Sequence, residues 1–187
     1  GNGSLLSSIT KKVVINNFRQ NDLLKGGQGA PLAPIFHKLI SSIINKKYDV
    51  EFPINIINIG GIANITKIID DNLDPTKNIF AFDIGPGNCL IDQWIIKNSN
   101  DKYDRNGYIG ESGKIDKLIL NQAKENFIFN SYDQSLDVKD FDISFAKGLS
   151  LENGAATISS FTAKLIANGM SYTHSKYKSG IYNWLVC

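Results

Sequence analysis

The stretch Ile54-Asn55-Ile56-Ile57-Asn58-Ile59-Gly60-Gly61, followed by a second β-branched run from Ile62 to Ile69, decides how this chain folds. Two strand-type runs joined by a glycine pair predict an antiparallel hairpin, and we expect its turn to need positive φ. A dinucleotide-binding fold would instead open with a strand, a glycine fingerprint and a helix. The glycines here join two strands, so a hairpin turn could present backbone N–H groups to a phosphate.

Outward from the hairpin, strand-type and helix-type segments alternate, which predicts an α/β fold. A third strand is expected at Ile79–Phe82, ending at Asp83, with a glycine turn after it and then a helix. The other expected strands are Val13–Ile15 and Ile181–Cys187. The expected helices are, approximately, Pro34–Asn45, Cys89–Lys97, Ile115–Ala123 and Ala155–Ala167, with a polar linker or lid at Lys102–Gly113.

Composition excludes several classes of protein. Of the 187 residues, 42% are hydrophobic and 20% are charged, and the net charge is +2. This composition is too apolar for a disordered chain. Such a balance leaves no basic excess for nucleic acid, and no apolar run reaches the ~20 residues of a membrane helix. The start of the chain lacks a secretory signal. It also lacks an initiator Met, which suggests a processed chain or a piece of a longer one. Cys89 and Cys187 are the only cysteines, so we expect a protein of the reducing cytoplasm, with a buried free thiol at Cys89.

Three constellations carry candidate chemistry. In the first, Arg19 and Asp22 precede the loop Gly26-Gly27-Gln28-Gly29-Ala30-Pro31-Leu32. The Arg19 guanidinium could bind a carboxylate or phosphate while the glycine loop lets backbone amides approach a ligand. An Arg19–Asp22 ion pair beside a helix cap explains the same residues equally well.

The second and third constellations lie around the hairpin. Asn58 and Asn64 flank its turn within apolar strands, where an amide needs a hydrogen-bond partner, although an ordinary hairpin is the favoured interpretation. Asp83 precedes Gly85-Pro86-Gly87-Asn88, so it could act as a general base while the N–H groups that open the next helix face an anion. Asp83 or Asn88 as a plain helix N-cap is the competing interpretation.

Taken together, these stretches resemble one family, the anhydro-N-acetylmuramic acid kinases of bacterial cell-wall recycling. The resemblance covers nearly the whole chain and weakens after Asn130. The segments that carry it are Asn17-Phe18-Arg19 with Asp22, residues 26–32, Asn58–Asn64, Phe82–Asn88, Asp92–Ile95, Tyr103-Asp104 and Ser112-Gly113.

The resemblance implies an actin-like ATPase (ribonuclease H-like) sugar-kinase fold, here incomplete. Residues 1–50 would be the end of the first lobe and a connecting helix, and residues 51–187 a partial second lobe. It implies ATP and Mg²⁺ as cofactors, an anhydro-amino-sugar substrate, no nucleic acid or membrane partner, and a possible homodimer. The implied roles are a catalytic base at Asp83, sugar binding at Arg19, Gln28 and Gly29, and phosphate binding at Gly60, Gly61, Asn64, Gly85, Gly87 and Asn88.

The chain also departs from the family pattern. It lacks the glycine-, serine- and threonine-rich phosphate loop, the His-Gly-Gln-Thr segment and the triple-glycine nucleotide motif. Asn17 replaces an Asp, and Gln134-Ser135 replaces a Lys-Ser step. Three hypotheses follow: part of an active kinase, an inactive remnant without ATP affinity, or a sugar-binding or regulatory module that uses the same pocket.

Other conspicuous side chains have simpler interpretations. We expect His37 to be a satisfied structural histidine, and Phe36 and Trp94 to be core residues. Asp101, Asp104 and Glu111 could hold a metal, but a polar lid explains them equally well.

Overall fold

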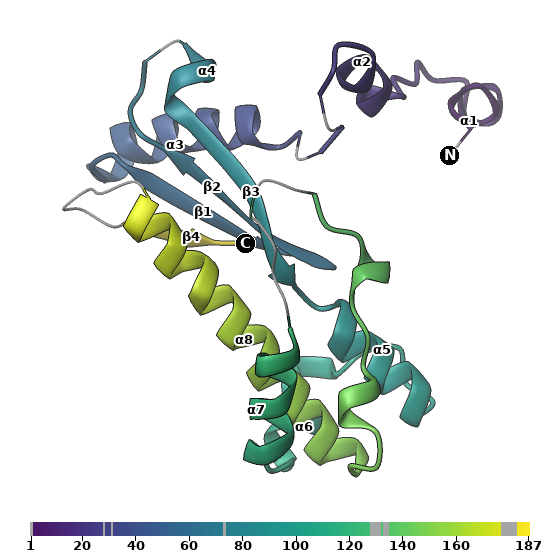
Figure 1. The fold of residues 1–187 in the computed structure, drawn as a ribbon. Helices are drawn as coiled ribbons and strands as arrows, with labels where there is room; N and C mark the ends of the chain where they lie inside the picture. Colours follow the sequence, from purple (N-terminus) through teal and green to yellow (C-terminus); the bar gives the residue numbers. More distant parts are fainter. Residues whose placement is uncertain are drawn as a thin grey trace. The chain divides into compact units, whose positions relative to one another are not determined.

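The computed structural model describes residues 2–27, 29–30, 32–72, 74–127, 132, 135–176 and 183–187. The chain divides into two compact units, Gly1–Ala33 and Pro34–Cys187 (Figure 1). Each unit is described by itself below.

The first unit contains two short helices. Helix α1 (Gly3–Thr10) begins at Asn2, whose side chain accepts a hydrogen bond from the Leu5 N–H, and α2 spans Phe18–Leu24. The strand expected at Val13–Ile15 is wrong: these residues are unpaired, and the Val13 side chain is 93% exposed. A β-branched run becomes a strand only when another strand pairs with it, and the described part of residues 1–33 offers none.

The second unit is built on one mixed sheet, in which the described residues form four strands in the order β3-β2-β1-β4. These are β1 (Ile54–Ile59), β2 (Ile62–Ile68), β3 (Ile79–Pro86) and β4 (Asn183–Val186). Strands β1 and β2 pair antiparallel, as do β2 and β3, whereas β4 lies parallel to β1. The predicted hairpin is confirmed, and so is the last strand, except for positions 181 and 182, which lie outside the described residues.

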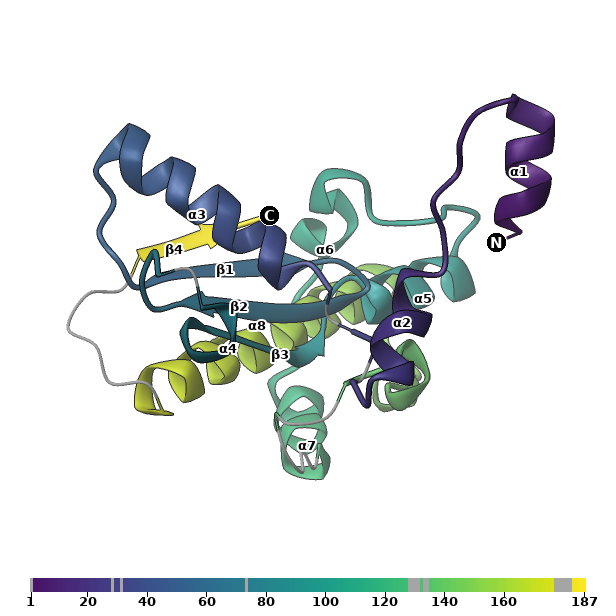
Figure 2. The same ribbon diagram turned by 90° about the horizontal axis from the view of Figure 1, so that it is seen from above.

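Two long helices lie on opposite faces of this sheet (Figure 2). Helix α3 (Pro34–Tyr48) contacts β2 and β3, and the His37 Nδ1 lies 2.7 Å from the Thr66 Oγ1. Helix α8 (Leu151–Lys176) contacts the opposite side chains of β2 and β3. There, Ile166 and Met170 pack against the cluster that contains Ile65. The contact between His37 and Thr66 confirms the predicted structural role of His37.

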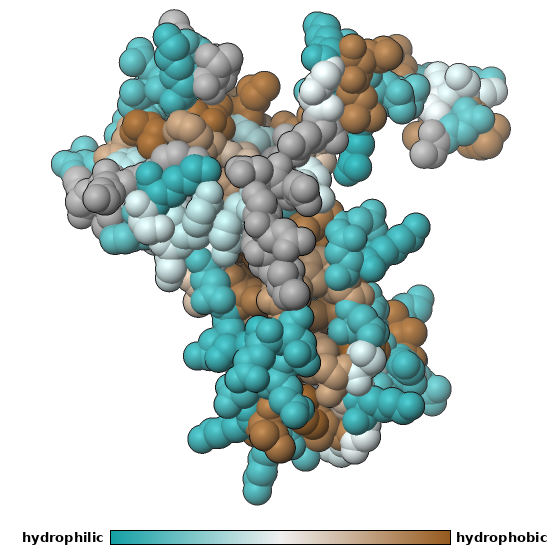
Figure 3. All heavy atoms as spheres, viewed as in Figure 1, coloured by the Kyte–Doolittle hydropathy of each residue, from teal (hydrophilic) through white to brown (hydrophobic). Residues whose placement is uncertain are grey.

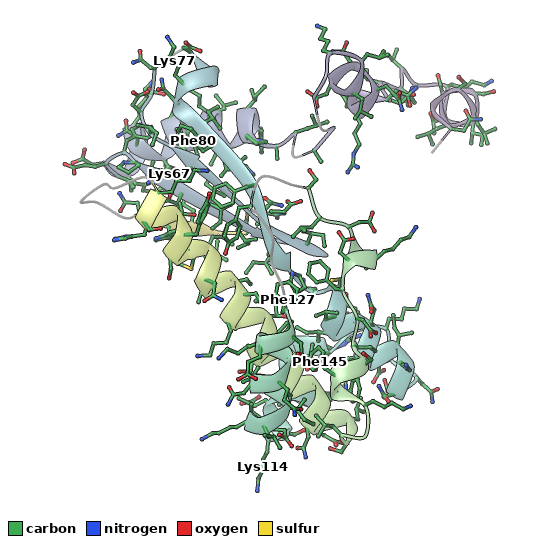
Figure 4. All side chains as sticks on the ribbon, viewed as in Figure 1. Lys67, Lys77, Phe80, Lys114, Phe127 and Phe145 are labelled. Carbon is green, nitrogen blue, oxygen red and sulfur yellow. The ribbon has the colours of Figure 1, made fainter. Side chains whose placement is uncertain are left out.

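Three of the shorter helices pack against α8: α5 (Cys89–Asn98), α6 (Tyr108–Ser112) and α7 (Lys117–Asn126). Helix α4 (Pro75–Asn78) instead leads directly into β3, and three 3₁₀ turns lie at Arg105–Gly107, Val138–Asp140 and Ser144–Ala146. Phe127 and Phe145 both contact the ring of Phe161 on α8, with centroid distances of 5.6 and 5.1 Å (Figure 4). This aromatic contact closes the core between the helices.

Two of the predicted core residues differ in outcome. Trp94 is buried, and its indole N–H donates to the Leu151 carbonyl at 2.8 Å, so that prediction is confirmed. Phe36 is 60% exposed, and that prediction is wrong, because its side of α3 faces away from the sheet. Cys89 is a buried free thiol, as expected. None of the described helices is both long enough and apolar enough to traverse a lipid bilayer.

Candidate functional site

Asp83 lies inside a strand rather than at its end. Strand β3 continues to Pro86, three residues beyond the expected carboxyl end, and Asp83 pairs directly with Asn64 of β2. Its side chain is only 8% exposed. Burial raises the pKa of the Asp83 carboxyl group, and a backbone hydrogen bond from Leu136 offsets part of that rise. A carboxylate with a raised pKa is a stronger base and is better suited to accept a proton.

The hydrogen bond to Asp83 comes from a distant segment. The Leu136 N–H donates to the Asp83 Oδ2 at 2.8 Å, so the carboxylate is not bonded within its own turn. A backbone N–H has no signature in the sequence, and for this reason the contribution of Leu136 could not be predicted. This hydrogen bond restricts the orientation of the carboxylate.

A polar row crosses three strands at this point. Asn58 of β1 pairs with Asn64 of β2, and Asn64 pairs with Asp83 of β3. Directly paired residues project from the same face of a sheet, so the three side chains lie in a line on the face that carries α3. The Asn64 side chain is partly exposed and makes no hydrogen bond to another described residue. It is therefore available to a ligand.

The N-terminal end of helix α3 is the end nearer to this row. His37 lies against Thr66 of β2, and Ser42 bonds Asp71 beyond the end of that strand, so α3 and β2 run in the same direction. The N-terminal turn of α3 is consequently the end of the helix nearer to Asn64. The positive end of the helix dipole favours negative charge in that region.

The glycine turn of the hairpin is bonded to the start of α5. The N–H groups of Gly87 and Asn88 donate to the carbonyls of Gly61 and Gly60, at 3.0 and 2.7 Å, and the Cys89 N–H donates to Gly61 at 3.3 Å. The expectation that these helix-opening N–H groups face an anion is therefore corrected: each has a protein acceptor. The N–H groups of Gly60 and Gly61 have no acceptor among the described residues, and they remain the amides a phosphate could meet.

The expected positive φ at the hairpin turn is also corrected, because neither Gly60 nor Gly61 has it. The last β1–β2 pair is Ile59 with Ala63, so three residues lie between the last two paired positions, instead of the two of a tight turn. The glycine requirement falls on the facing turn instead. Gly85 has φ of +148°, and a Cβ on Gly87 would lie 2.0 Å from the Gly60 carbonyl oxygen.

Asn88 is not a plain helix cap. It occupies the N-cap position of α5 but makes no side-chain cap hydrogen bond. Its side-chain amide donates instead to the Ile59 carbonyl at 3.3 Å. Both Asn88 and the N–H groups beside it thus hold the hairpin turn against the helix.

The candidate sugar-binding residues lie in the first unit. Arg19 is exposed on α2, and no ion pair joins it to Asp22 among the described residues of that unit. The Asp22 carboxylate accepts from the Gly29 N–H at 2.7 Å, and Gly29 itself has φ of +71°. Asp22 therefore holds the glycine loop and leaves the Arg19 guanidinium available. Gln28 lies outside the described residues.

A buried lysine is the polar residue that sequence reasoning missed. Lys67 of β2 is fully buried beside Phe80 of β3, on the sheet face that carries α8 (Figure 4). Burial lowers the pKa of its ammonium group. The signal was present as the single charged residue of the β2 run.

The described residues contain no group of three or more His, Cys, Asp or Glu side chains that could hold a metal. Asp104, one of the candidate ligands, accepts from the N–H groups of Ile109 and Gly110, both at 2.9 Å. The polar-lid interpretation accounts for it. A cavity of about 350 Å³ lies between α7, α8 and the segment 140–145, and it does not include Asp83.

The fold and the site together define an α/β domain that sets a buried carboxylate beside a glycine turn, an arrangement typical of enzymes. Comparison with known proteins identifies the family. The family model for anhydro-N-acetylmuramic acid kinase matches residues 1–180, and the chain belongs to that family.

Curated relatives carry the same name. The anhydro-N-acetylmuramic acid kinase of Pelagibacter ubique is 52% identical over 168 residues, which covers 89% of this chain and 43% of the relative. The Zymomonas mobilis kinase is 37% identical over 173 residues, covering 92% and 45%. The Rhodospirillum rubrum kinase is 35% identical over 188 aligned residues, covering 100% and 46%. The chain thus spans less than half the length of these relatives.

Proposed function

We propose that this chain supplies the base-bearing part of an ATP-dependent kinase that opens and phosphorylates anhydro-N-acetylmuramic acid, within an actin-like sugar-kinase fold. The observation that carries the proposal is Asp83, a buried carboxylate with a raised pKa beside a glycine turn. The product would be N-acetylmuramic acid 6-phosphate, formed in the recycling of cell-wall peptidoglycan.

In this reaction, Asp83 accepts a proton from water. The water oxygen bonds to the anomeric carbon of the 1,6-anhydro sugar, and the bond from that carbon to O6 breaks. O6 takes the γ-phosphoryl group of ATP, which leaves as ADP. The Leu136 N–H holds the Asp83 carboxylate in one orientation, so that its other oxygen can face the water.

The remaining groups have binding roles in the proposal. The free N–H groups of Gly60 and Gly61, with the Asn64 amide, would contact the phosphates. Gly85, Gly87 and Asn88 would act indirectly, because they keep the hairpin turn in place. Arg19, Gln28 and Gly29 are proposed to bind the sugar.

In phosphoryl transfer, magnesium offsets the negative charge of the phosphates. The described residues offer no ligand cluster for it, which fits an ion that enters with the nucleotide and keeps most of its waters. No step of the proposal passes through a protein-bound metal.

The test uses a complete kinase in which this chain replaces the matching segment of the Pelagibacter ubique relative. Asp83 is then substituted in that kinase. Asp83→Asn should lower turnover by about 10²–10⁴-fold, because the proton acceptor is lost. Sugar binding, measured by calorimetry, should remain. The matched control is Asp74→Asn, which removes an exposed carboxylate from a surface ion pair and should leave turnover unchanged.

Other outcomes assign other roles. Unchanged turnover in Asp83→Asn would remove Asp83 from the base role. An exchanged kinase that binds the sugar but forms no phosphorylated product, even with Asp83 intact, would favour the sugar-binding module.

A further inference from the structure

Helix α3 carries apolar residues on two sides. On the side that faces the sheet, His37 and Ser41 are buried, and Ile40 and Ile44 beside them are partly buried. At about 100° per residue, Ile35, Phe36, Leu39 and Ile43 fall within an arc of about 100° on the other side, and we call these four residues the α3 outer face. A helix with apolar residues on both sides is typical of a buried helix packed between two layers.

The α3 outer face is uncovered in its unit. The exposed fractions of its side chains are 72% for Ile35, 60% for Phe36, 57% for Leu39 and 53% for Ile43. Figure 3 shows apolar atoms gathered on the surface over α3. A contiguous exposed apolar patch on a folded domain marks an interaction surface.

The charges on α3 restrict what can cover this face. The helix contains Lys38, Lys46 and Lys47 and no acidic residue. A well-matched occupant would therefore have an apolar centre with carboxylates at its edge.

The family comparison indicates the occupant. The chain covers only 43–46% of the length of the relatives that match it over nearly all of its own residues. We infer that the α3 outer face is the docking surface for the part of the kinase that this chain does not span, whether that part is joined to it or supplied as a separate polypeptide. This inference rests on membership of the family and not on the proposed reaction.

The experiment measures binding and needs no catalysis. The portion of the Pelagibacter ubique kinase outside the matched 168 residues is produced as one or two tagged polypeptides and mixed with the full 187-residue chain. Complex formation is followed by light scattering after gel filtration and by titration. The test variant is Leu39→Glu with Ile43→Glu, which places two charges on the outer face. The control is Lys114→Gln with Lys124→Gln, which changes the net charge by the same amount at exposed positions away from α3.

We expect the chain to bind the remaining portion, the test variant to bind at least about tenfold more weakly, and the control to match the original chain. Circular dichroism and thermal melting show whether the test variant is folded. If it is not, Leu39→Ser with Ile43→Ser provides the smaller change. Equal binding by the folded variant and the original chain would overturn the inference, and so would no binding by the original chain. A homodimer that the variant abolishes, without any complex with the remaining portion, would assign the face to a second copy and overturn it as well.

Discussion

The backbone N–H of Leu136 lies 2.8 Å from the Oδ2 of Asp83, joining two residues that are 53 positions apart in the chain. This contact holds a buried carboxylate at the edge of the sheet. The hydrogen bond favours the charged form of Asp83, but burial opposes it more strongly, and the pKa stays raised. Asp83 is therefore oriented by the fold at the expense of stability at neutral pH.

The pH dependence of stability follows from that balance. The pKa of Asp83 is higher in the folded chain than its ordinary value of 3.8. Between those two pKa values the folded state binds a proton that the unfolded state lacks, so the free energy of unfolding falls as pH rises through this window. We expect Asp83→Asn to be more stable than the original chain at pH 7 and to lose that advantage below about pH 4. Denaturant unfolding over a pH series measures this difference.

The control is again Asp74→Asn, which should stay within about 0.5 kcal/mol of the original chain across the series. An Asp83→Asn variant that is less stable at pH 7 than at pH 4, relative to the original chain, would contradict the sign of the Asp83 pKa shift.

The two glycine turns predict opposite responses to an added methyl group. A Cβ on Gly87 would lie 2.0 Å from the Gly60 carbonyl oxygen, which cannot retreat without breaking its bond to the Asn88 N–H. Gly87→Ala should therefore lower the free energy of unfolding by about 3 kcal/mol. At Gly61 the nearest atom would be a Val138 methyl at 3.9 Å, so Gly61→Ala should change it by no more than about 0.5 kcal/mol. Chemical denaturation of both variants distinguishes the positions, and equal losses would refute the argument.

The hairpin could be predicted because its evidence is local: two β-branched runs and a glycine pair within 16 residues. The conformation of its turn could not, because the sequence does not reveal how many residues stay unpaired. Phe36 shows a second limit. Helical spacing marks it as apolar and inward-facing, but spacing cannot say whether the layer that would cover it belongs to the same unit.

The candidate site divides in the same way. The position of Asp83 beside a glycine turn could be predicted from the order of residues along the chain. The engaged N–H groups of Gly87, Asn88 and Cys89 could not, because their acceptors lie in another turn, 26–28 residues earlier. Contacts between distant turns depend on strand register, and a bulge between Ala63 and Asn64 shifts that register here.

His37 should make stability depend on pH in the direction opposite to Asp83. Its ring is buried against Thr66, and burial lowers its pKa below the ordinary value of 6.5. The stabilising neutral form is fully present above that value, and its contribution is lost as pH falls toward the folded-state pKa. We expect the free energy of unfolding to fall more steeply from pH 7 to pH 5 in the original chain than in His37→Gln. His174→Gln, at an exposed position on α8, should keep the steeper profile, and identical slopes in all three proteins would rule out a role for His37.

Asn64 should matter for activity and little for stability. It lies directly opposite Asp83, on the same face of the sheet, and its amide has no hydrogen-bond partner among the described residues. A hydrogen bond to a charged ligand group is worth about 1.5–3 kcal/mol, so Asn64→Ala in the exchanged kinase should lower kcat/KM by about 10–100-fold. The free energy of unfolding should change by less than about 0.5 kcal/mol, because no protein hydrogen bond is lost. Asn58→Ala is the matched comparison, since Asn58 lies in the same row but about 10 Å from Asp83, two strands away, and should have a smaller effect on kcat/KM. Equal losses in the two variants would show that the row contributes as a polar surface and that Asn64 has no specific contact with the ligand.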